Sequence, residues 1–398
     1  LKWARKYISE NRRGAKPEKA NVILKSGDII RLLKNDANEW MLSQIPDVEG
    51  GLISITPNDG SVLALVGGFN YFKNKFNHVT QAKRQAGSGF KPFIYSAALE
   101  AGKSAASIIN DAPVVFEDPG IEDEWRPENY SKKSHGPTRL REALIHSRNL
   151  VSIRLLHSIG ISFALEHIKK FGFDVGILPK NLSLALGSAE VSPWELVRGY
   201  AVFANGGFQI EPYFINETKT YDDQIIFRAN QPVVCKRCIN LQKERSQIIE
   251  NDSIIEENET GLINENDDIN TIYAPRVVDD KNIWIMNTIT RDVIKYGTGR
   301  RALELQRNDL SGKTGTTNDQ HDAWFSGFNS NIATVSWVGF DKFKPLGTRE
   351  TGGRAALPMW IDYMREALKG MPDSIIQRPK GLITVRIDSG TGEATNAD

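Results

Sequence analysis

The sequence has few cysteines, no long apolar run and almost no net charge, and each shortage excludes a class of protein. Its two cysteines, Cys235 and Cys238, form a single C-x-x-C pair. A zinc site needs two more ligands nearby, and a redox site needs a thioredoxin-like βαβ context. The sequence around this pair shows neither of these features. A local disulfide or a plain surface pair is therefore expected, with no metal and no cofactor.

Charge and hydropathy exclude two further classes. The chain has 50 Lys and Arg against 49 Asp and Glu, a net charge of +1 over 398 residues, so nothing favours nucleic acid as a partner. No apolar run approaches the roughly 20 residues that a membrane helix needs, and no signal sequence opens the chain. Its first residue is Leu1, and the opening reads like the middle of a protein, so we expect upstream domains or an anchor.

The first part of the chain predicts a small β region followed by a sheet and then helices. Residues 1–48 are polar and mixed, with strand-like runs at 22–24 and 29–33. A strand, a turn and a second strand are predicted over 51–66. Helical periodicity, ended by glycines, covers 89–101, 138–146, 149–158, 162–171 and 193–205.

The second part begins with an acidic, Asn-rich stretch, 213–275, that predicts an insertion or flexible lobe. After a helix near 281–295, β-branched and aromatic runs predict adjacent antiparallel strands at 309–318, 322–329 and 332–340. A helix is predicted at 356–369 and one more strand at 382–387. We therefore expect a mixed α/β chain with an accessory region at 1–48, a main domain at 49–370 and the start of an extension at 371–398.

The first motif with chemical meaning is an S-x-x-K, Ser88 to Lys91, at the start of a predicted helix. Residues three apart lie on one helix face, so the hydroxyl and the amine can approach each other. The helix N-terminus favours negative charge on the serine oxygen. As a base near neutrality, the lysine needs a pKa about 3 below its ordinary value, which burial beside a second cation can supply. Taken alone, the motif fits an N-cap serine and a solvated lysine better.

The second motif is Ser147-Arg148-Asn149, at the junction of two predicted helices. Residues two apart on a tight turn can face one cleft, where Ser147 offers a hydroxyl for proton relay and Asn149 an amide for a peptide carbonyl. Serine and asparagine are also favoured at helix ends and turns, which explains an isolated S-x-N equally well.

The third motif is Lys313-Thr314-Gly315-Thr316, within a predicted strand. Alternation places Thr314 and Thr316 on one face and Lys313 and Gly315 on the other. Gly315 would let a peptide backbone lie close to the strand edge, and a cation with two hydroxyls suits a terminal carboxylate. An exposed Thr-rich edge strand is the alternative interpretation of this motif alone.

The three motifs occur together, in this order and in suitable contexts, which makes chance a poor explanation. The triplet is typical of class A β-lactamases and penicillin-binding proteins. Longer strings resemble the class A penicillin-binding proteins, the bifunctional peptidoglycan synthases of Gram-negative type, and differ from them in Ala86, commonly Pro, and Gly89, often Ser. The matching strings are 63–68, 84–93, 125–129, 185–188, 204–207 and 322–327.

The resemblance implies a serine transpeptidase fold, like that of the β-lactamases, with an antiparallel sheet flanked by helices and an all-helical lobe. Residues 1–48 resemble the end of a small OB-like accessory domain. The family's membrane anchor and glycosyltransferase domain are expected in the full-length protein, at the periplasmic face of the inner membrane, and no glycosyltransferase signature appears in this chain.

The resemblance also implies the roles of the motif residues. Ser88 would attack the bond between two D-alanines with Lys91 as base, and the backbone N–H groups of Ser88 and Thr316 would hold the oxyanion. Ser147 and Lys313 would relay the proton to the leaving D-Ala. The substrate-binding residues would be Asn149, Thr314, Gly315 and Thr316.

The implied partners are peptidoglycan stem peptides: a D-Ala-D-Ala donor and an acceptor amine, which we expect to be that of meso-diaminopimelate. β-Lactam antibiotics would acylate Ser88. Three alternatives share the motifs: a D,D-carboxypeptidase, a serine β-lactamase and a non-catalytic β-lactam sensor or scaffold. A β-lactamase would need a deacylating carboxylate between the second and third motifs, where Glu190 and Glu195 lie.

Two neighbouring features have ordinary interpretations. His321 beside Asp322 suggests a catalytic pair, but adjacent strand residues point apart, so a surface role is expected for the histidine. Trp324 fits the core about as well as the border of a cleft.

Overall fold

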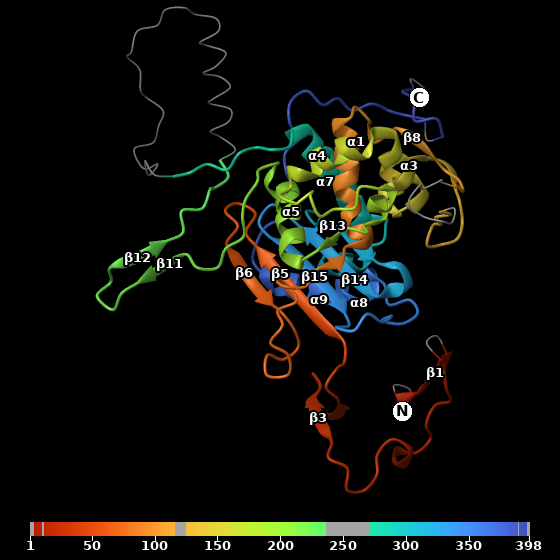
Figure 1. The fold of residues 1–398 in the computed structure, drawn as a ribbon, viewed down its shortest axis with the longest axis vertical. Helices are drawn as coiled ribbons and strands as arrows, with labels where there is room; N and C mark the ends of the chain where they lie inside the picture. Colours follow the sequence, from red (N-terminus) through yellow and green to blue (C-terminus); the bar gives the residue numbers. More distant parts are fainter. Residues whose placement is uncertain (1–3, 10–11, 116–124, 236–270, 389, 396–398) are drawn as a thin grey trace, which may run out of the picture.

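The computed structural model describes residues 4–9, 12–115, 125–235, 271–388 and 390–395. Its centre is a five-stranded antiparallel sheet in the order β13-β14-β15-β5-β6 (Figure 1). The strands of this sheet are β5 (Glu49–Ile55), β6 (Val62–Val66), β13 (Ser311–Thr316), β14 (Asp322–Phe328) and β15 (Ala333–Gly339). The earliest strands therefore pair with the latest, and β13 lies at one edge of the sheet.

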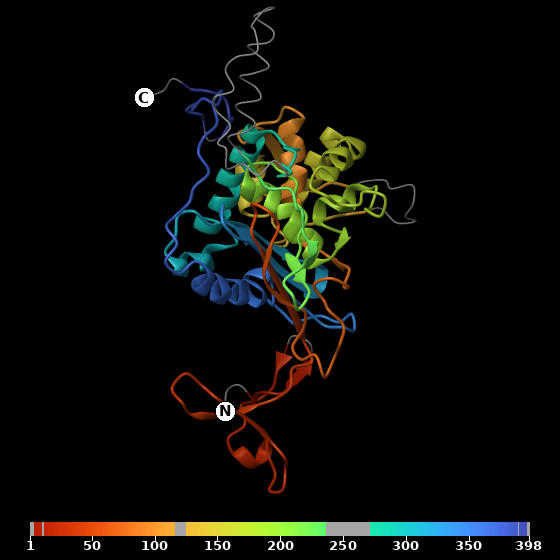
Figure 2. The same ribbon diagram turned by 90° about the vertical axis from the view of Figure 1, so that its left-hand side faces the viewer.

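Helices cover both faces of the sheet, as the two views show (Figures 1 and 2). The α-helices are α1 (Lys91–Glu100), α2 (Leu140–Ile145), α3 (Asn149–Ile159), α4 (Ile161–Lys169), α5 (Pro193–Asn205), α7 (Asp280–Lys295), α8 (Gly352–Ala355) and α9 (Leu357–Ala367). α5 and α7 pack on one face, with α1 and α4 beyond them, and α8 and α9 pack on the other. This mixed α/β architecture confirms the predicted fold class.

Strand alternation explains why the sheet has two covered faces. Along β14, Trp324 and Phe328 point into the larger core under α5, while Ala323 and Phe325 point into the smaller core with Trp360 of α9. Successive side chains of a strand point to opposite faces of the sheet. A sheet buried between two helical layers therefore needs apolar side chains on both faces. Trp324 is fully buried, so its place in the core, rather than at the cleft, is settled.

The remaining strands form small two-stranded sheets around this body. They are β1 (Tyr7–Ser9) with β2 (Arg12–Arg13), β3 (Arg31–Lys34) with β4 (Trp40–Ser43), β7 (Arg84–Gln85) with β10 (Glu190–Val191), β8 (Ile108–Asp111) with β9 (Gly136–Arg139), and β11 (Glu217–Lys219) with β12 (Ile225–Arg228). The described part of residues 1–48 extends away from the sheet and its helices (Figures 1 and 2).

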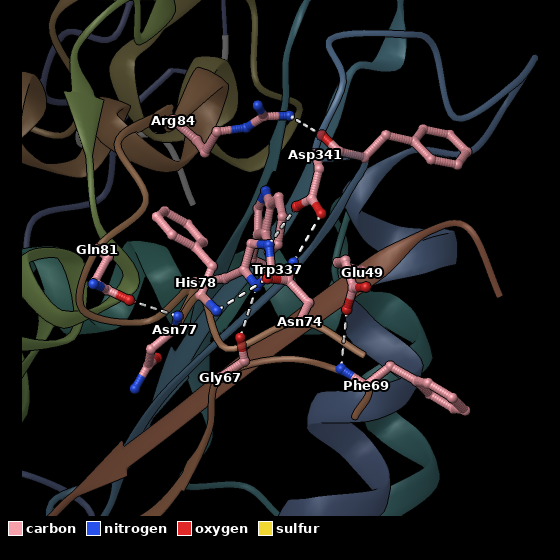
Figure 3. A network of polar contacts seen from close by, with 12 residues as sticks. Glu49, Gly67, Phe69, Asn74, Asn77, His78, Gln81, Arg84, Trp337 and Asp341 are labelled. Carbon is pink, nitrogen blue, oxygen red and sulfur yellow. Dashed lines mark hydrogen bonds and ion pairs between the residues drawn. The ribbon is translucent and has the colours of Figure 1, made fainter. Parts of the chain in front are cut away.

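A buried histidine fixes the sheet corner from which the chain runs toward Ser88 (Figure 3). The two ring nitrogens of His78 lie 2.7 Å from the Gly67 carbonyl and 2.6 Å from the Asp341 carboxylate, and its ring stacks on Trp337. Both ring nitrogens of this buried imidazole have a hydrogen-bonding partner, so burial leaves neither of them unsatisfied. Because Gly67 follows β6 and Asp341 follows β15, His78 joins two loops that are distant in sequence.

Most predicted elements are confirmed, with two wrong at the ends of the chain. The run 22–24 was expected to be a strand, but the 3-10 helix η2 (Ala20–Val22) occupies its start. The run 382–387 forms no strand in the described residues and makes only one isolated bridge, between Ile387 and Ala394. In neither place does a neighbouring strand supply the hydrogen bonds on which strand structure depends.

The predicted insertion at 213–275 is only partly described. Its start carries the exposed β11–β12 hairpin, and residues 236–270 lie outside the described residues. Cys235 is disulfide-bonded, and Cys238 is among the residues that are not described. Across the described ranges, no helix has the length and apolar character needed to cross a bilayer.

Candidate active site

Ser88 lies in a short 3-10 turn, η3 (Gly87–Phe90), that leads directly into α1. The α-helix itself begins at Lys91, so the serine precedes it by one turn, and Pro92 takes a helix position that needs no N–H donor. Ser88 is partly exposed and lines a cleft of about 840 Å³. Within the described part of the chain, its hydroxyl makes no hydrogen bond.

Ser147 has a left-handed backbone between α2 and α3, with φ of +57°. For a non-glycine residue this conformation costs about 1–2 kcal/mol, so the surrounding contacts must stabilise it. It directs both the carbonyl and the hydroxyl of Ser147 toward two buried lysines. The predicted inter-helix turn is confirmed, and its strain is of the kind found at functional sites.

The two lysines meet at Ser147 although they come from different elements. Lys91 Nζ of α1 donates to the Ser147 carbonyl at 2.9 Å and to Asn149 Oδ1 at 2.7 Å, and lies 3.4 Å from Ser147 Oγ. Lys313 Nζ of β13 donates to Ser147 Oγ at 3.0 Å and to the Thr314 carbonyl at 2.9 Å. The structure thus brings residues of all three motifs into one hydrogen-bonded group.

Burial lowers the pKa of both lysines, each of which is fully inaccessible to solvent. For Lys91, burial is the largest cause, the charge of Lys313 lowers the pKa further, and the carboxylate of Asp111 raises it, so that it lies well below its ordinary value. Burial alone lowers the pKa of Lys313 to about 7. Because Lys91 bears both penalties, we expect it to lose its proton first, which ends the repulsion on Lys313.

The strand β13 forms the opposite wall of the cleft. Thr314 and Thr316 both line it, as strand alternation predicts, while the Lys313 side chain is buried behind them. Thr314 Oγ1 lies 2.7 Å from Thr298 Oγ1, and Thr316 Oγ1 accepts the backbone N–H of Gly352 at 3.0 Å. These contacts fix both hydroxyls while each retains hydrogen-bonding capacity for a ligand.

Glycines allow the Ser88 turn to lie directly against β13. A Cβ at Gly315 would lie 2.5 Å from the Ala86 carbonyl oxygen, and one at Gly87 would lie 2.5 Å from the Thr316 carbonyl oxygen. A third glycine, Gly187, packs on the other side of the turn, where a Cβ would lie 1.7 Å from the Gly87 carbonyl oxygen. In the structure the close neighbour of Gly315 is therefore the chain's own Ser88 turn.

Several cleft residues were missed by the sequence motifs. The segment 125–130 forms one wall, and Thr317 to Gln320 and Thr298 form others. Behind the cleft, Asn129 contacts the start of α3, and Asp111 contacts Asn129. The string 125–129 carried a signal, because it matched the resembled family, but no chemical role could be read from it.

Four acidic or histidine candidates lie outside the cleft. Glu195 completes a capping box with Ser192 at the start of α5 and pairs with Lys83, so it has a structural role. Glu190 is exposed in β10 and does not line the cleft. His321 stacks on Phe343 with ring centroids 3.9 Å apart.

Asp322, the fourth candidate, is buried and does not pair with its neighbour His321. Its Oδ1 accepts from Arg84 Nε at 2.7 Å and from Trp337 Nε1 at 2.9 Å. In the described ranges, no group of three or more His, Cys, Asp or Glu side chains could hold a metal ion.

The comparisons with known proteins agree with this geometry. Residues 50–343 match the penicillin-binding protein transpeptidase domain, and residues 1–48 match the penicillin-binding protein OB-like domain. Penicillin-binding protein 1A of Pseudomonas aeruginosa is 44% identical over 408 residues, covering 99% of this chain and 49% of that protein. Penicillin-binding protein 1A of Escherichia coli K12 is 35% identical over 439 residues, covering 100% of this chain and 51% of that protein.

A solved structure shows the same likeness. The crystal structure of penicillin-binding protein 1A from Haemophilus influenzae superposes with a TM-score of 0.83 at 36% identity, covering 94% of this chain and 55% of that one. The chain spans about half the length of the curated relatives it matches. On the match over residues 50–343, the chain belongs to the penicillin-binding protein transpeptidase family.

Proposed function

We propose that this chain is a peptidoglycan D,D-transpeptidase that joins stem peptides through an acyl-enzyme on Ser88. The observation that carries the proposal is the group formed by Lys91, Ser147 and Lys313 beside a partly exposed serine in a cleft. Two buried amines around one hydroxyl, each with a pKa lowered by burial, are typical of catalytic sites. Family membership supports peptidoglycan as the material acted upon.

The first half-reaction forms the acyl-enzyme. A neutral Lys91 amine takes the proton of the Ser88 hydroxyl, and Ser88 Oγ bonds to the carbonyl carbon between the two D-alanines. The Ser147 carbonyl and Asn149 Oδ1 can accept both hydrogens of that neutral amine, which leaves its lone pair for the proton. The tetrahedral oxyanion would be held by the backbone N–H groups of Ser88 and Thr316.

Collapse of the tetrahedral intermediate breaks the C–N bond and needs a proton for the leaving amine. Lys91, which holds the proton taken from Ser88, passes it to Ser147 Oγ, and Ser147 gives its own hydroxyl proton to the leaving nitrogen while Lys313 Nζ donates to Ser147 Oγ. D-Ala then departs as a neutral amine. In the second half-reaction the side-chain amine of another stem peptide attacks the ester, loses its proton to Lys91 and regenerates Ser88.

Substrate binding falls to the cleft walls. Thr314 and Thr316 present hydroxyls beside the positive charge of Lys313, which suits the terminal carboxylate of the donor peptide. Asn149 Nδ2 donates one hydrogen to the Glu128 carbonyl, and its second hydrogen suits a peptide carbonyl of the donor. We infer meso-diaminopimelate as the acceptor and the periplasmic face of the inner membrane as the location.

The alternatives are less well supported. Neither Glu190 nor Glu195 lines the cleft, so the deacylating carboxylate that a β-lactamase needs has no candidate at those two positions. A D,D-carboxypeptidase would pass the acyl group to water. A cross-linking assay with lipid-linked precursor, with a glycosyltransferase supplied, separates the two by its product: cross-linked dimer or trimmed stem peptide.

Intact-mass spectrometry with a penicillin tests the proposal directly. We expect one stable adduct on Ser88, because β-lactams resemble the D-Ala-D-Ala end and leave an ester that neither Glu190 nor Glu195, both outside the cleft, can help to hydrolyse. Ser88→Ala should carry no adduct, whereas the matched surface change Ser104→Ala should be labelled normally. Rapid penicillin hydrolysis would favour a β-lactamase, and an unlabelled protein would refute acylation at Ser88.

The rate of this acylation is expected to follow a bell-shaped pH profile. It should rise with pH as Lys91 loses its proton, since only the neutral amine is a base, and fall as Lys313 loses its proton near pH 7. Second-order rate constants with a penicillin report the free protein. Lys313→Arg keeps its charge at all these pH values, so its alkaline limb should disappear; an unchanged limb would assign it to another group.

A further inference from the structure

Asn129 supports the start of α3 from behind the cleft, and its side chain is almost fully buried. Its Oδ1 accepts the backbone N–H of Asn149 at 2.7 Å and of Leu150 at 3.3 Å. These are two of the unpaired donors with which every helix begins. The residue before them, Arg148, makes no side-chain cap of its own, so the cap of α3 comes from a distant segment.

The two hydrogen bonds that the Asn129 side-chain amide donates fix its orientation. Asn129 Nδ2 donates to Asp111 Oδ1 at 2.7 Å and to the Lys133 carbonyl at 2.9 Å. All four hydrogen-bonding positions of the amide are thus used, and a reversed amide would place donors against donors. The cap on α3 therefore depends on Asp111 as well as on Asn129.

Asp111 is a fully buried carboxylate at the end of β8, the strand that pairs with β9. Its Oδ2 lies 2.9 Å from His135 Nδ1, and its backbone carbonyl accepts the His135 N–H at 3.1 Å. Asp111 and His135 thus pair at one end of the described segment 125–135, which carries one cleft wall. Buried carboxylates are retained where hydrogen bonds and a nearby cation offset their desolvation.

The segment 125–135 contacts Asn149 at a second point. Asn149 Nδ2 donates to the Glu128 carbonyl at 2.8 Å, while its Oδ1 accepts from Lys91. The segment 125–135, which is hydrogen-bonded to Asp111, therefore holds both the backbone and the side chain of Asn149. Through Asn149 it fixes where the Lys91 amine lies.

We propose that Asp111 and Asn129 are positioning residues for acylation: together they hold Asn149, and through it Lys91, in reactive geometry. The inference rests on the proposed function. The Asp111 carboxylate has a second effect, because its charge favours the ammonium form of Lys91. Among the described residues, the charged or titratable groups around Asp111 and Lys91 are Lys313 from β13, His135 from the segment 125–135 and Tyr95 from α1.

The test measures second-order acylation of Ser88 by a penicillin, by intact mass, as a function of pH. Asn129→Ala removes the cap and should lower the rate about 10–100-fold, since displacement of a catalytic group by about 1 Å can cost that much. It leaves the Asp111 charge in place, so its acid limb should not move. Asp111→Asn keeps the shape and removes the charge, so its acid limb should move to lower pH.

A rescue experiment separates positioning from general damage. Asn129→Asp alone places two carboxylates face to face and should be slow. Combining it with Asp111→Asn restores one donor and one acceptor with reversed polarity and should recover part of the lost rate. No such recovery is expected if the two residues only contribute separately to stability.

Asn205→Ala is the matched control. Asn205 is an equally buried asparagine that holds backbone groups at the end of α5 through four hydrogen bonds, away from the cleft. It should lower the melting temperature while the acylation rate per folded molecule stays unchanged. Should Asn129→Ala fail to fold, the isosteric Asp111→Asn and the double variant carry the test.

The outcomes are distinguishable from failure of the proposed function. A wild-type protein without an adduct overturns the acylation chemistry itself. A labelled wild-type protein whose Asn129→Ala variant reacts at the same rate overturns only the positioning role. An acid limb that stays in place in Asp111→Asn overturns the electrostatic part of the inference.

Discussion

Lys91→Met is expected to lower the rate of Ser88 acylation by about 10²–10⁴-fold, the range that a positioned general base contributes. Methionine has a similar length and suits a buried site, but it cannot accept a proton. The change leaves Asn149 Oδ1 and the Ser147 carbonyl without a donor at about 1–3 kcal/mol each, partly offset because no cation is buried any longer.

The measurement is the time course of the penicillin adduct, alongside a thermal melt. Lys170→Met is the matched control, because Lys170 is a half-exposed lysine in a surface pair with Glu100 and should not affect acylation. A Lys91→Met protein that acylates as fast as the wild type would show that another group removes the proton from Ser88.

Gly187→Ala is expected to abolish acylation and to destabilise the fold by about 2–5 kcal/mol, the sum of overpacking and left-handed strain. Its Cβ would lie 1.7 Å from the Gly87 carbonyl oxygen, and backbone atoms cannot yield as a flexible side chain does. The Ser88 turn must therefore shift from its place between Gly187 and β13, and the two proposed oxyanion donors would lose their alignment.

Gly102→Ala is the control for the backbone term. Gly102 ends α1 in a left-handed turn, where the Lys103 N–H donates to the Ala98 carbonyl, with φ of +86° against +80° for Gly187, and an added Cβ there meets no atom within 4 Å. It should cost only about 1–2 kcal/mol of strain and leave acylation intact. Melting temperatures and adduct yields of both variants decide the matter: equal losses would mean that the contact with Gly87 is unimportant.

The elements that the sequence predicted well are those whose burial pattern is local. Helix α5 has a capping box at Ser192 and glycines at its end, and its predicted bounds match. Strand β14 is rich in aromatic residues and β15 in β-branched ones. The run 382–387 is also rich in β-branched residues but has no partner strand among the described residues, and pairing is a property of the whole fold rather than of the run.

The residues of the candidate site also differ in how well the sequence predicts them. The three motifs predicted Ser88, Lys91 and Lys313 as site residues, because short spacings are enough to suggest their chemistry, and the structure brings these residues into the same region. Asp111 and Asn129 could not be found this way, since their contacts join residues that are 18 and 20 positions apart in the sequence. The left-handed conformation of Ser147 was likewise invisible, because tertiary contacts impose it on a residue with no such preference.

The strand order has a consequence for how the protein reaches its native state. β5 pairs with β15, and Ser54 of one contacts Thr334 of the other across 280 residues of chain. Such distant pairing carries a large loop-closure entropy and makes folding slow. During synthesis, β5 and β6 must wait for β15 to emerge, while their unpaired edges remain open to other chains. Chaperone protection in that interval would benefit this domain more than one built from local hairpins.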